Sequence, residues 1–117
     1  MLKPYATVIA VRDMNATAEY FRDALGFAID WAEATDWRLV SRGQVRLMIG
    51  HCPNVIPISE LGDHGYVAYL EVEDIGALHS ELVGRGAIIR MPPTDRPYGM
   101  REMLVATPDG HRIMIAS

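Results

Sequence analysis

The amino-acid sequence predicts an α+β protein made of two paired βαβββ modules that form an open, barrel-like curved sheet within the single domain 1–117. Three observations predict this class. Of the 117 residues, 50% are hydrophobic and 22% are charged, which is typical of a globular domain. The apolar pattern changes between strand-like and helix-like in the order strand, helix, strand, strand, strand. The same order then returns after about 60 residues.

The first module is expected at about residues 1–52. A strand opens it at 5–11, and Asp13 and Asn15 follow as candidate N-caps. A helix is expected at 16–25, because apolar residues recur there at helical spacing. Its buried stripe is expected to be Thr17, Tyr20, Phe21, Ala24 and Leu25. Three strands complete the module, at residues 27–33, 37–41 and 45–50.

The second module, at about residues 66–117, follows a linker at about 53–65 that is rich in proline and small polar residues. Asp74 is a candidate N-cap of its helix, which is expected to end near Gly84 or Gly86. The apolar stripe of this helix is expected to be Ile75, Leu78 and Leu82. The strands are expected at residues 66–72, 87–91, 101–107 and 112–116, with a proline-rich loop at 92–99.

The repeat is also visible in the amino-acid letters. Val-Arg-Asp at residues 11–13 corresponds to Val-Glu-Asp at residues 72–74. Gly43, before the last strand of the first module, corresponds to Gly110 before the last strand of the second. Neither module is long enough to bury a sheet face alone, so the modules are expected to pack on each other or on another chain.

Charge and composition argue against several classes of partner. The chain has 11 basic and 15 acidic residues, a net charge of -4, and no basic run, which argues against nucleic acid. No apolar run approaches the roughly 18 residues of a membrane span, and no signal-peptide core is visible. We therefore expect a cytoplasmic protein with no membrane partner. The single cysteine, Cys52, suits a reducing compartment.

Four segments together carry a resemblance to a known family, at residues 11–13, 20–27, 70–74 and 108–111. The chain resembles the vicinal oxygen chelate superfamily, which includes glyoxalase I, extradiol dioxygenases, fosfomycin-modifying enzymes and bleomycin resistance proteins. Residues 30–49 and 98–105 look most like the bleomycin resistance protein branch. The resemblance covers essentially the whole chain. It implies a homodimer with a large crevice at the dimer interface that sequesters a drug without changing it chemically.

The resemblance also raises the question of a metal. Catalytic members of the superfamily hold one divalent metal on His, Glu or Gln side chains, one from each of four inward-facing strand positions. Those positions correspond here to Ala6, Met48, Val67 and Met114. None carries a nitrogen or a carboxylate oxygen, and thioether sulfur is a poor ligand for Mg, Mn, Zn or Fe(II). A one-residue slip of register recovers no usual ligand set either. We therefore expect no metal, no other cofactor and no catalytic residue.

Strand alternation, with its parity taken from the metal positions, gives the concave face of the sheet. The inward residues are then Ala6, Val8, Ala10, Arg46, Met48, Gly50, Val67, Tyr69, Glu71, Arg112, Met114 and Ala116. The opposite faces are apolar or small, as expected beneath helices. A mixed polar and apolar concave wall is typical of a ligand pocket. Met48 and Met114 fit either core packing or a pocket that adapts to its ligand.

Four aromatic residues are candidates for contact with a ligand. Trp31 and Trp37 lie on one hairpin, either as core or interface residues or as a stacking wall for a planar ligand. Tyr69 is the best single candidate, because the resemblance places an aromatic residue of bleomycin resistance proteins there. Tyr98 lies in the proline-rich loop, either covering the pocket or exposed in a turn.

The charged residues leave the sign of the ligand open. Arg46 and Arg112, on the inward face, favour an anionic or carbonyl-rich ligand. The acidic residues around the tryptophans would favour a cationic one if they face it; these are Asp30, Glu33 and Asp36. Glu71 either faces the ligand or pairs with one of the two arginines, because buried charges are usually paired.

The sequence supports three functions. The first is a metal-independent protein that confers resistance by sequestering a planar or glycopeptide antibiotic. The second is a metal-dependent lyase, isomerase or dioxygenase of the same superfamily with divergent ligands. The third is a small-molecule sensor or partner subunit without activity. In the first, the ligand-binding residues are Trp31, Trp37, Arg46, Met48, Tyr69, Glu71, Tyr98, Arg112 and Met114.

Overall fold

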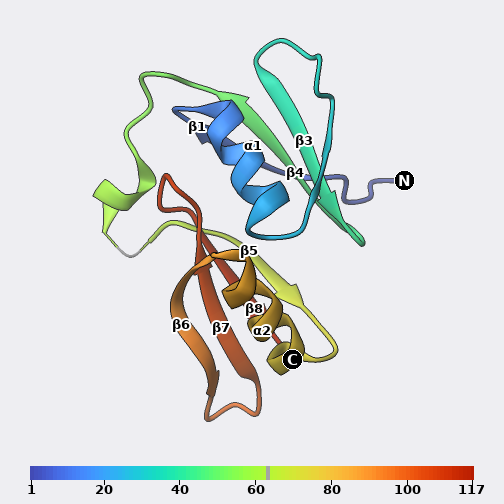
Figure 1. Ribbon diagram of the computed structural model, residues 1–117, viewed down its shortest axis with the longest axis vertical. Helices are drawn as coiled ribbons and strands as arrows, with labels where there is room; N and C mark the ends of the chain where they lie inside the picture. The colour runs from blue at the N-terminus through green and yellow to red at the C-terminus, as the bar shows by residue number, and fades with distance from the viewer. Residues whose placement is uncertain (63) are drawn as a thin grey trace. The chain divides into compact units, whose positions relative to one another are not determined.

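The structure, a computed structural model, describes residues 1–62 and 64–117 and confirms the α+β class. The chain divides into two compact units, Met1–Pro57 and Ile58–Ser117. Each unit contains one α-helix and one mixed four-stranded sheet, as Figure 1 shows. In the part of the chain that is described, neither α-helix is long and apolar enough to cross a membrane.

The first unit follows the predicted order of strand, helix and three further strands. Its elements are β1 (Thr7–Val11), α1 (Met14–Asp23), β2 (Ala28–Asp30), β3 (Trp37–Arg42) and β4 (Val45–His51). β1 pairs in parallel with β4, and β3 pairs antiparallel with both β4 and β2. The order across the sheet is therefore β1-β4-β3-β2.

The second unit repeats this topology after a short 3-10 helix. Its elements are η1 (Ile58–Leu61), β5 (Tyr66–Glu71), α2 (Ile75–Arg85), β6 (Ile88–Asp95), β7 (Arg101–Ala106) and β8 (Arg112–Ala116). The order across its sheet is β5-β8-β7-β6, with β5 and β8 parallel. η1 lies inside the linker expected at residues 53–65, of which Asp63 lies outside the described residues.

Equivalent aspartates begin the two helices. The Asp13 carboxylate accepts a hydrogen bond from the Ala16 N–H at 3.0 Å, and the Asp74 carboxylate accepts one from the Ala77 N–H at 3.0 Å. Each carboxylate satisfies one N–H group that has no partner within its helix. Because Asp13 is the N-cap of α1, the helix begins ahead of the residues 16–25 expected from the apolar spacing.

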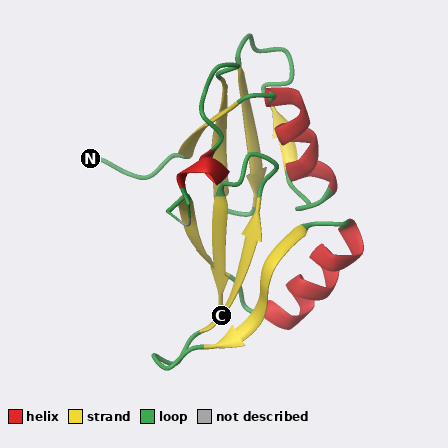
Figure 2. Cartoon of the chain, turned by 90° about the vertical axis from the view of Figure 1, so that its left-hand side faces the viewer, coloured by secondary structure: helices red, strands yellow, loops and turns green. Residues whose placement is uncertain are grey.

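Each helix covers one face of its own sheet, α1 against β2, β3 and β4, and α2 against β6 and β7 (Figure 2). Phe21 of α1 is fully buried and packs edge-to-face on Phe27, with ring centroids 5.1 Å apart. The expected stripe of α1 is buried except for Tyr20, which is half-buried. The other buried side chains of the two cores include Ile9, Val11, Val40, Leu47, Ile49, Ile75, Leu82, Met103, Val105, Ile113 and Ile115. Full burial of such a side chain stabilises a fold by roughly 1.5–3 kcal/mol.

The opposite face of each sheet is not covered by the α-helix of its own unit. We call it the open face. The parity predicted for this face agrees with the register of β1, β4 and β8 and with that of β5 from Ala68 onward. Met48 is the register partner of Val8 in the first sheet, and Met114 is the register partner of Tyr69 in the second. Val8 is 59% exposed and Tyr69 is 53% exposed, whereas their neighbours on the helix-covered faces are buried or half-buried.

Two edge strands, β2 and β6, differ most in length from the prediction. β2 ends at Asp30 because Trp31 has a left-handed backbone, with φ of 57°, that stops the pairing. β6 runs on to Asp95 and includes Pro92 and Pro93, which the sequence pattern places in a loop. Proline has no N–H to donate, but an edge strand does not need every donor, and two register shifts in the β6–β7 ladder accommodate it.

The turns before β4 and β8 contain the equivalent glycines Gly43 and Gly110 in different surroundings. Both have left-handed backbones, with φ of 57° and 91°. A Cβ on Gly43 would meet nothing within 4 Å, but on Gly110 it would lie 2.6 Å from Ser59 Cβ and 2.8 Å from Ser59 N. The glycine lets η1 approach the turn, where the Ser59 N–H donates to the Asp109 carbonyl at 3.1 Å.

We therefore expect Gly110→Ala to lower the free energy of unfolding more than Gly43→Ala. Left-handed strain of about 1–2 kcal/mol is common to both changes, so Gly43→Ala is the matched control. Overlap with the Ser59 backbone adds about 1–3 kcal/mol at Gly110 alone. Urea denaturation of the two variants measures the difference. Equal losses of stability would contradict the packing of η1 against this turn.

Candidate ligand-binding site

Trp37 lies on the open face of the first sheet and packs on a glycine. Its register partner is Gly50 of β4. A Cβ on Gly50 would lie 3.1 Å from Cζ3 and 3.2 Å from Cη2 of the Trp37 indole. The indole therefore rests on the sheet where the neighbouring strand has no side chain, and the residue still remains 39% exposed. Met48, the next open-face residue of β4, is half-buried.

Trp31 lies in the loop that joins β2 to β3, and the guanidinium of Arg38 holds this loop. Trp31 and Asp36 both have positive φ, 57° and 63°, which costs on the order of 1–3 kcal/mol for each residue. Arg38 Nη1 donates to the carbonyl oxygens of Ala34 at 2.5 Å, Trp37 at 2.7 Å and Trp31 at 3.4 Å. These hydrogen bonds offset the strain and fix the backbone of both tryptophans. The sequence pattern does not mark Arg38.

The two arginines predicted on the open faces each stack on a tyrosine. Arg46 Cζ lies 4.8 Å from the ring centroid of Tyr5, and Arg112 Cζ lies 5.6 Å from that of Tyr66. Such cation–π contacts are worth about 0.5–1 kcal/mol at exposed sites. They occupy the flat face of each guanidinium and leave its N–H edge for other partners.

Strict strand alternation fails at Val67. β5 has an irregularity there, because Tyr66 is the register partner of Arg112 while Ala68 is that of Ile113. Tyr66, and not Val67, therefore stands beside Arg112 on the open face, where it is 53% exposed. An extra residue in a strand leaves no clear mark in an apolar sequence, so the sequence gives no sign of Tyr66.

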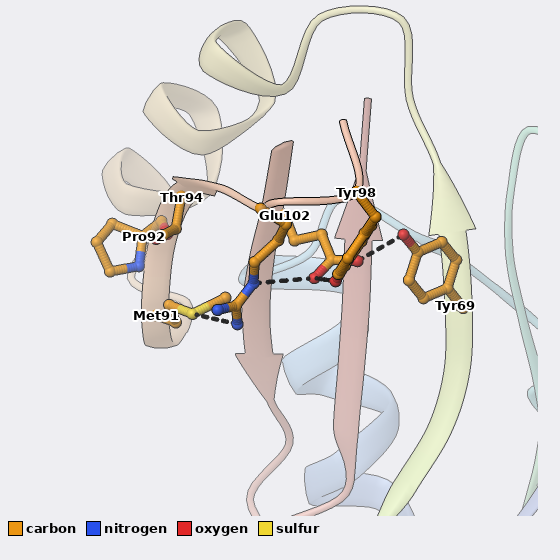
Figure 3. A network of polar contacts seen from close by, with 7 residues as sticks. Tyr69, Met91, Pro92, Thr94, Tyr98 and Glu102 are labelled. Atoms are coloured by element: carbon orange, nitrogen blue, oxygen red, sulfur yellow. Dashed lines mark hydrogen bonds and ion pairs between the residues drawn. The ribbon is translucent and has the colours of Figure 1, made fainter. Parts of the chain in front are cut away.

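The open face of the second sheet carries a hydrogen-bonded network around one buried carboxylate, Glu102 of β7, shown in Figure 3. The Tyr69 hydroxyl donates to Glu102 Oε2 at 2.6 Å, and the Tyr98 hydroxyl donates to Oε1 at 2.6 Å. Arg96 Nε donates to the same Oε1 at 3.2 Å. A second nitrogen of Arg96 lies 3.2 Å from Met91 Sδ. Glu102 itself is only 3% exposed.

The topology explains how Tyr69 of β5 reaches Glu102 of β7, although these two strands are not adjacent. β8 lies between β5 and β7, and its residue in register with Glu102 is Ala116. The small methyl group of Ala116 leaves room above β8 for the tyrosine to cross. Tyr98 and Arg96 come from the turn between β6 and β7, which closes with a hydrogen bond from the Arg96 N–H to the Met100 carbonyl at 2.8 Å.

The hydrogen bonds shift the pKa values of the acid and the phenols in opposite directions. Donation by Tyr69, Tyr98 and Arg96 lowers the pKa of Glu102 below 4.5, although burial opposes this. The hydrogen bond to Glu102 raises the pKa of Tyr69 to about 12 and also raises that of Tyr98. The Glu102 contribution to stability is present above pH 4.5 and is lost as the pH falls through its lowered pKa. The Tyr69 contribution is present below pH 10 and is lost as the pH rises toward about 12.

Of the predicted ligand-binding residues, the structure brings Tyr69, Tyr98 and Met114 together on the open face of the second sheet. Arg112 and Glu71 lie on the same face, toward the two ends of the strands, and Glu71 is exposed. The described ion pair on this face joins Arg96 to Glu102 and does not involve Glu71, the acid considered from the sequence. The remaining predicted residues, which lie in the first unit, are Trp31, Trp37, Arg46 and Met48.

The residues of the candidate site that the sequence pattern missed are Tyr5, Tyr66, Arg96 and Glu102. The sequence does contain a signal for Glu102, because this acid directly precedes the apolar run Met103–Ala106 on a predicted strand. A carboxylate in such a run indicates a buried acid with bound partners. The identity of those partners could not be predicted, since two come from a turn and one from β5.

By the resemblance, four strand positions correspond to those that hold the metal in catalytic members of the superfamily. The residues at these positions do not fit a metal ion here. Met48 and Met114 lie within β4 and β8, Ala6 precedes β1, and Val67 lies at the irregularity in β5. Among the described residues, no group of three or more His, Cys, Asp and Glu side chains is placed to hold a metal ion. Methionine sulfur and alkyl groups do not replace the missing donors for a hard divalent ion.

We expect Glu102→Gln to lower the pKa of Tyr69 from about 12 toward 10, because the negative charge that opposes phenolate formation is removed. Ultraviolet titration of phenolate absorbance measures this shift, and Tyr69→Phe identifies the contribution of Tyr69 to the curve. A late-titrating tyrosine that persists unchanged in Glu102→Gln would contradict the assigned hydrogen bonds.

Comparison with known proteins identifies the family of this chain and other structures with the same fold. A family model described as the Glyoxalase/Bleomycin resistance protein/Dioxygenase superfamily matches residues 4–115. No curated protein matches the chain. Three similar solved structures are a bleomycin resistance determinant encoded on the transposon Tn5, a bleomycin-binding protein complexed with bleomycin, and TioX from Micromonospora sp. ML1.

The structural similarity extends over nearly the whole of each chain, but the sequence identity is low. The Tn5 determinant is 21% identical, with a TM-score of 0.80 and coverage of 99% of this chain and 98% of that one. The bleomycin-binding protein is 20% identical, with a TM-score of 0.80 and coverage of 99% and 98%. TioX is 20% identical, with a TM-score of 0.74 and coverage of 97% and 98%. At these identities the structural likeness shows the fold, and the family model shows that this chain belongs to the Glyoxalase/Bleomycin resistance protein/Dioxygenase superfamily.

Proposed function

We propose that this protein binds a planar or glycopeptide antibiotic and sequesters it without chemical change. The observation that carries the proposal is the set of exposed aromatic side chains on the open faces. Tyr5 and Trp37 in the first unit and Tyr66, Tyr69 and Tyr98 in the second are each between 39% and 65% exposed. Flat apolar rings left accessible on a sheet are suited to stack on a flat ligand at low entropic cost.

The chemistry of the open faces supports binding over turnover. Glu102, the buried acid, has both oxygens occupied by donors and a lowered pKa, which makes it a poor proton acceptor at neutral pH. The metal positions of the superfamily lack donors, which supports metal independence. No observation favours the lyase, isomerase or dioxygenase alternative over binding.

Bleomycin is the first ligand to test. One structure with this fold is a bleomycin-binding protein complexed with bleomycin, and another is a bleomycin resistance determinant. We propose a cytoplasmic homodimer in which the crevice at the dimer interface receives the drug. The residues proposed to line it are Trp31, Trp37, Arg46, Met48, Tyr69, Glu71, Tyr98, Arg112 and Met114.

We expect bleomycin to quench the tryptophan fluorescence of the protein and to be recovered unchanged. Replacing Trp37 or Tyr69 by Ala should weaken binding by about threefold to tenfold, the range expected for loss of one stacking contact of about 0.5–1.5 kcal/mol. Val83→Ala is the matched control, because Val83 is 55% exposed but lies on α2.

Chelator treatment should leave the affinity for bleomycin unchanged, because the described residues offer no donor set for a metal. Product analysis by mass spectrometry accompanies the titration. A chemically altered drug, or binding that disappears with the metal, would refute sequestration.

We expect the protein to sediment as a homodimer of the 13.0 kDa chain at micromolar concentration. Large apolar side chains such as Val8 and Tyr66 are more than half exposed on the open faces, and exposed surfaces of this kind are commonly covered by association. Sedimentation velocity over a range of concentrations measures this. A single 13.0 kDa species throughout would remove the proposed interface.

A further inference from the structure

The hydroxyl hydrogens of Tyr69 and Tyr98 are both committed to one carboxylate. Each phenol lies 2.6 Å from a different oxygen of Glu102. An ionised carboxylate has no hydrogen to donate, so both hydrogen bonds must run from phenol to acid. The third contact, from Arg96 Nε at 3.2 Å, is also a donation and supports the ionised form.

A phenol that donates its only hydrogen can offer a ligand nothing except its oxygen lone pairs. Tyr69 and Tyr98 are 53% and 65% exposed, so their rings are accessible while their hydrogens are held beneath. The negative charge of Glu102, with Glu71 adding to it at Tyr69, makes these oxygens electron-rich, in line with the raised pKa values of both phenols. The pair is therefore chemically biased toward hydrogen-bond donors.

We infer that Tyr69 and Tyr98 form a hydrogen-bond-accepting clamp for planar aromatic amines, and that Glu102 is the positioning residue that fixes its polarity. This inference rests on the proposed function and names the class of ligand group that the second open face recognises. The rings supply stacking area, and the phenol oxygens accept N–H groups at the edge of the ligand. A ligand that presents carboxylate or carbonyl oxygens there meets lone pairs and finds no donor from either tyrosine.

Three planar probes test the polarity of the clamp at neutral pH. Proflavine is a cation with amino N–H donors, N-methylacridinium is a cation of similar shape without N–H groups, and acridine carboxylate is an anion. Comparing the first two separates donor recognition from simple charge attraction. Affinities are measured by probe fluorescence, with bleomycin titrated in parallel.

We expect proflavine to bind about threefold to tenfold more tightly than N-methylacridinium, the ratio for one hydrogen bond of ordinary strength, and acridine carboxylate to bind least. Tyr69→Phe and Tyr98→Phe should each reduce the preference for proflavine while keeping the ring. Val83→Ala is the control, because Val83 is 55% exposed but lies on α2 and not on the open face.

Glu102→Gln tests the positioning role of Glu102. The readout is the preference among the three probes, which a general loss of stability would not change. An amide can donate as well as accept, so one phenol hydrogen is released toward the ligand. The preference for proflavine over N-methylacridinium should shrink, and binding of acridine carboxylate should rise. If this variant does not fold, the two Phe variants decide, because both leave the Arg96–Glu102 ion pair in place.

Two results would overturn the inference and leave the proposed function intact. One is equal affinity for proflavine and N-methylacridinium in the native protein, or a preference that both Phe variants leave unchanged. The other is binding of bleomycin with no binding of any acridine probe. Failure to bind bleomycin and all three probes would instead overturn the proposed function itself.

Discussion

The one-sided burial of each sheet is the constraint on which the rest of this structure depends. Each unit has one α-helix and four strands, and this α-helix can cover only one sheet face. The covered faces take the aliphatic residues, such as Ile9, Leu47, Val105 and Ile113, and make the two cores. On the opposite faces Leu39 and Leu104 are still buried, but Val8, Trp37 and Tyr69 remain between 39% and 59% exposed. This explains how one short chain can be stable and also present tryptophan, tyrosine and arginine side chains on its open faces.

Glu102 shows how a charge can be kept on such a face without being available for reaction. Burying a carboxylate is unfavourable unless donors surround it, and here two phenols and a guanidinium do so. The same contacts that stabilise the charge also orient the phenols. One set of hydrogen bonds, drawn from β5, β7 and the turn between β6 and β7, therefore stabilises the charge and also shapes the proposed binding surface.

The chain belongs to a superfamily that includes metal-dependent enzymes, and the positions that the resemblance equates with their metal ligands carry no such ligand here. Methionine or an aliphatic residue stands at each position where the catalytic members carry a metal ligand. The strand pairings that place Met48 and Met114 mid-sheet are nevertheless retained. The side chains at these positions are suited to apolar contact and not to the coordination of a hard divalent ion.

The sequence by itself determined the fold class, the order of the main elements, the aspartate caps and the alternation along most strands. These follow from local rules, because period-2 alternation and the 3.6-residue repeat are written directly in the chain. It could not determine the end of β2 at Trp31, the prolines inside β6 or the irregularity at Val67, which depend on pairing with neighbouring strands. It also could not assemble Tyr69, Arg96, Tyr98 and Glu102, since residues 33 positions apart meet only when β8 places a small residue between them. Contacts across a sheet are set by register, and register is a property of the folded structure.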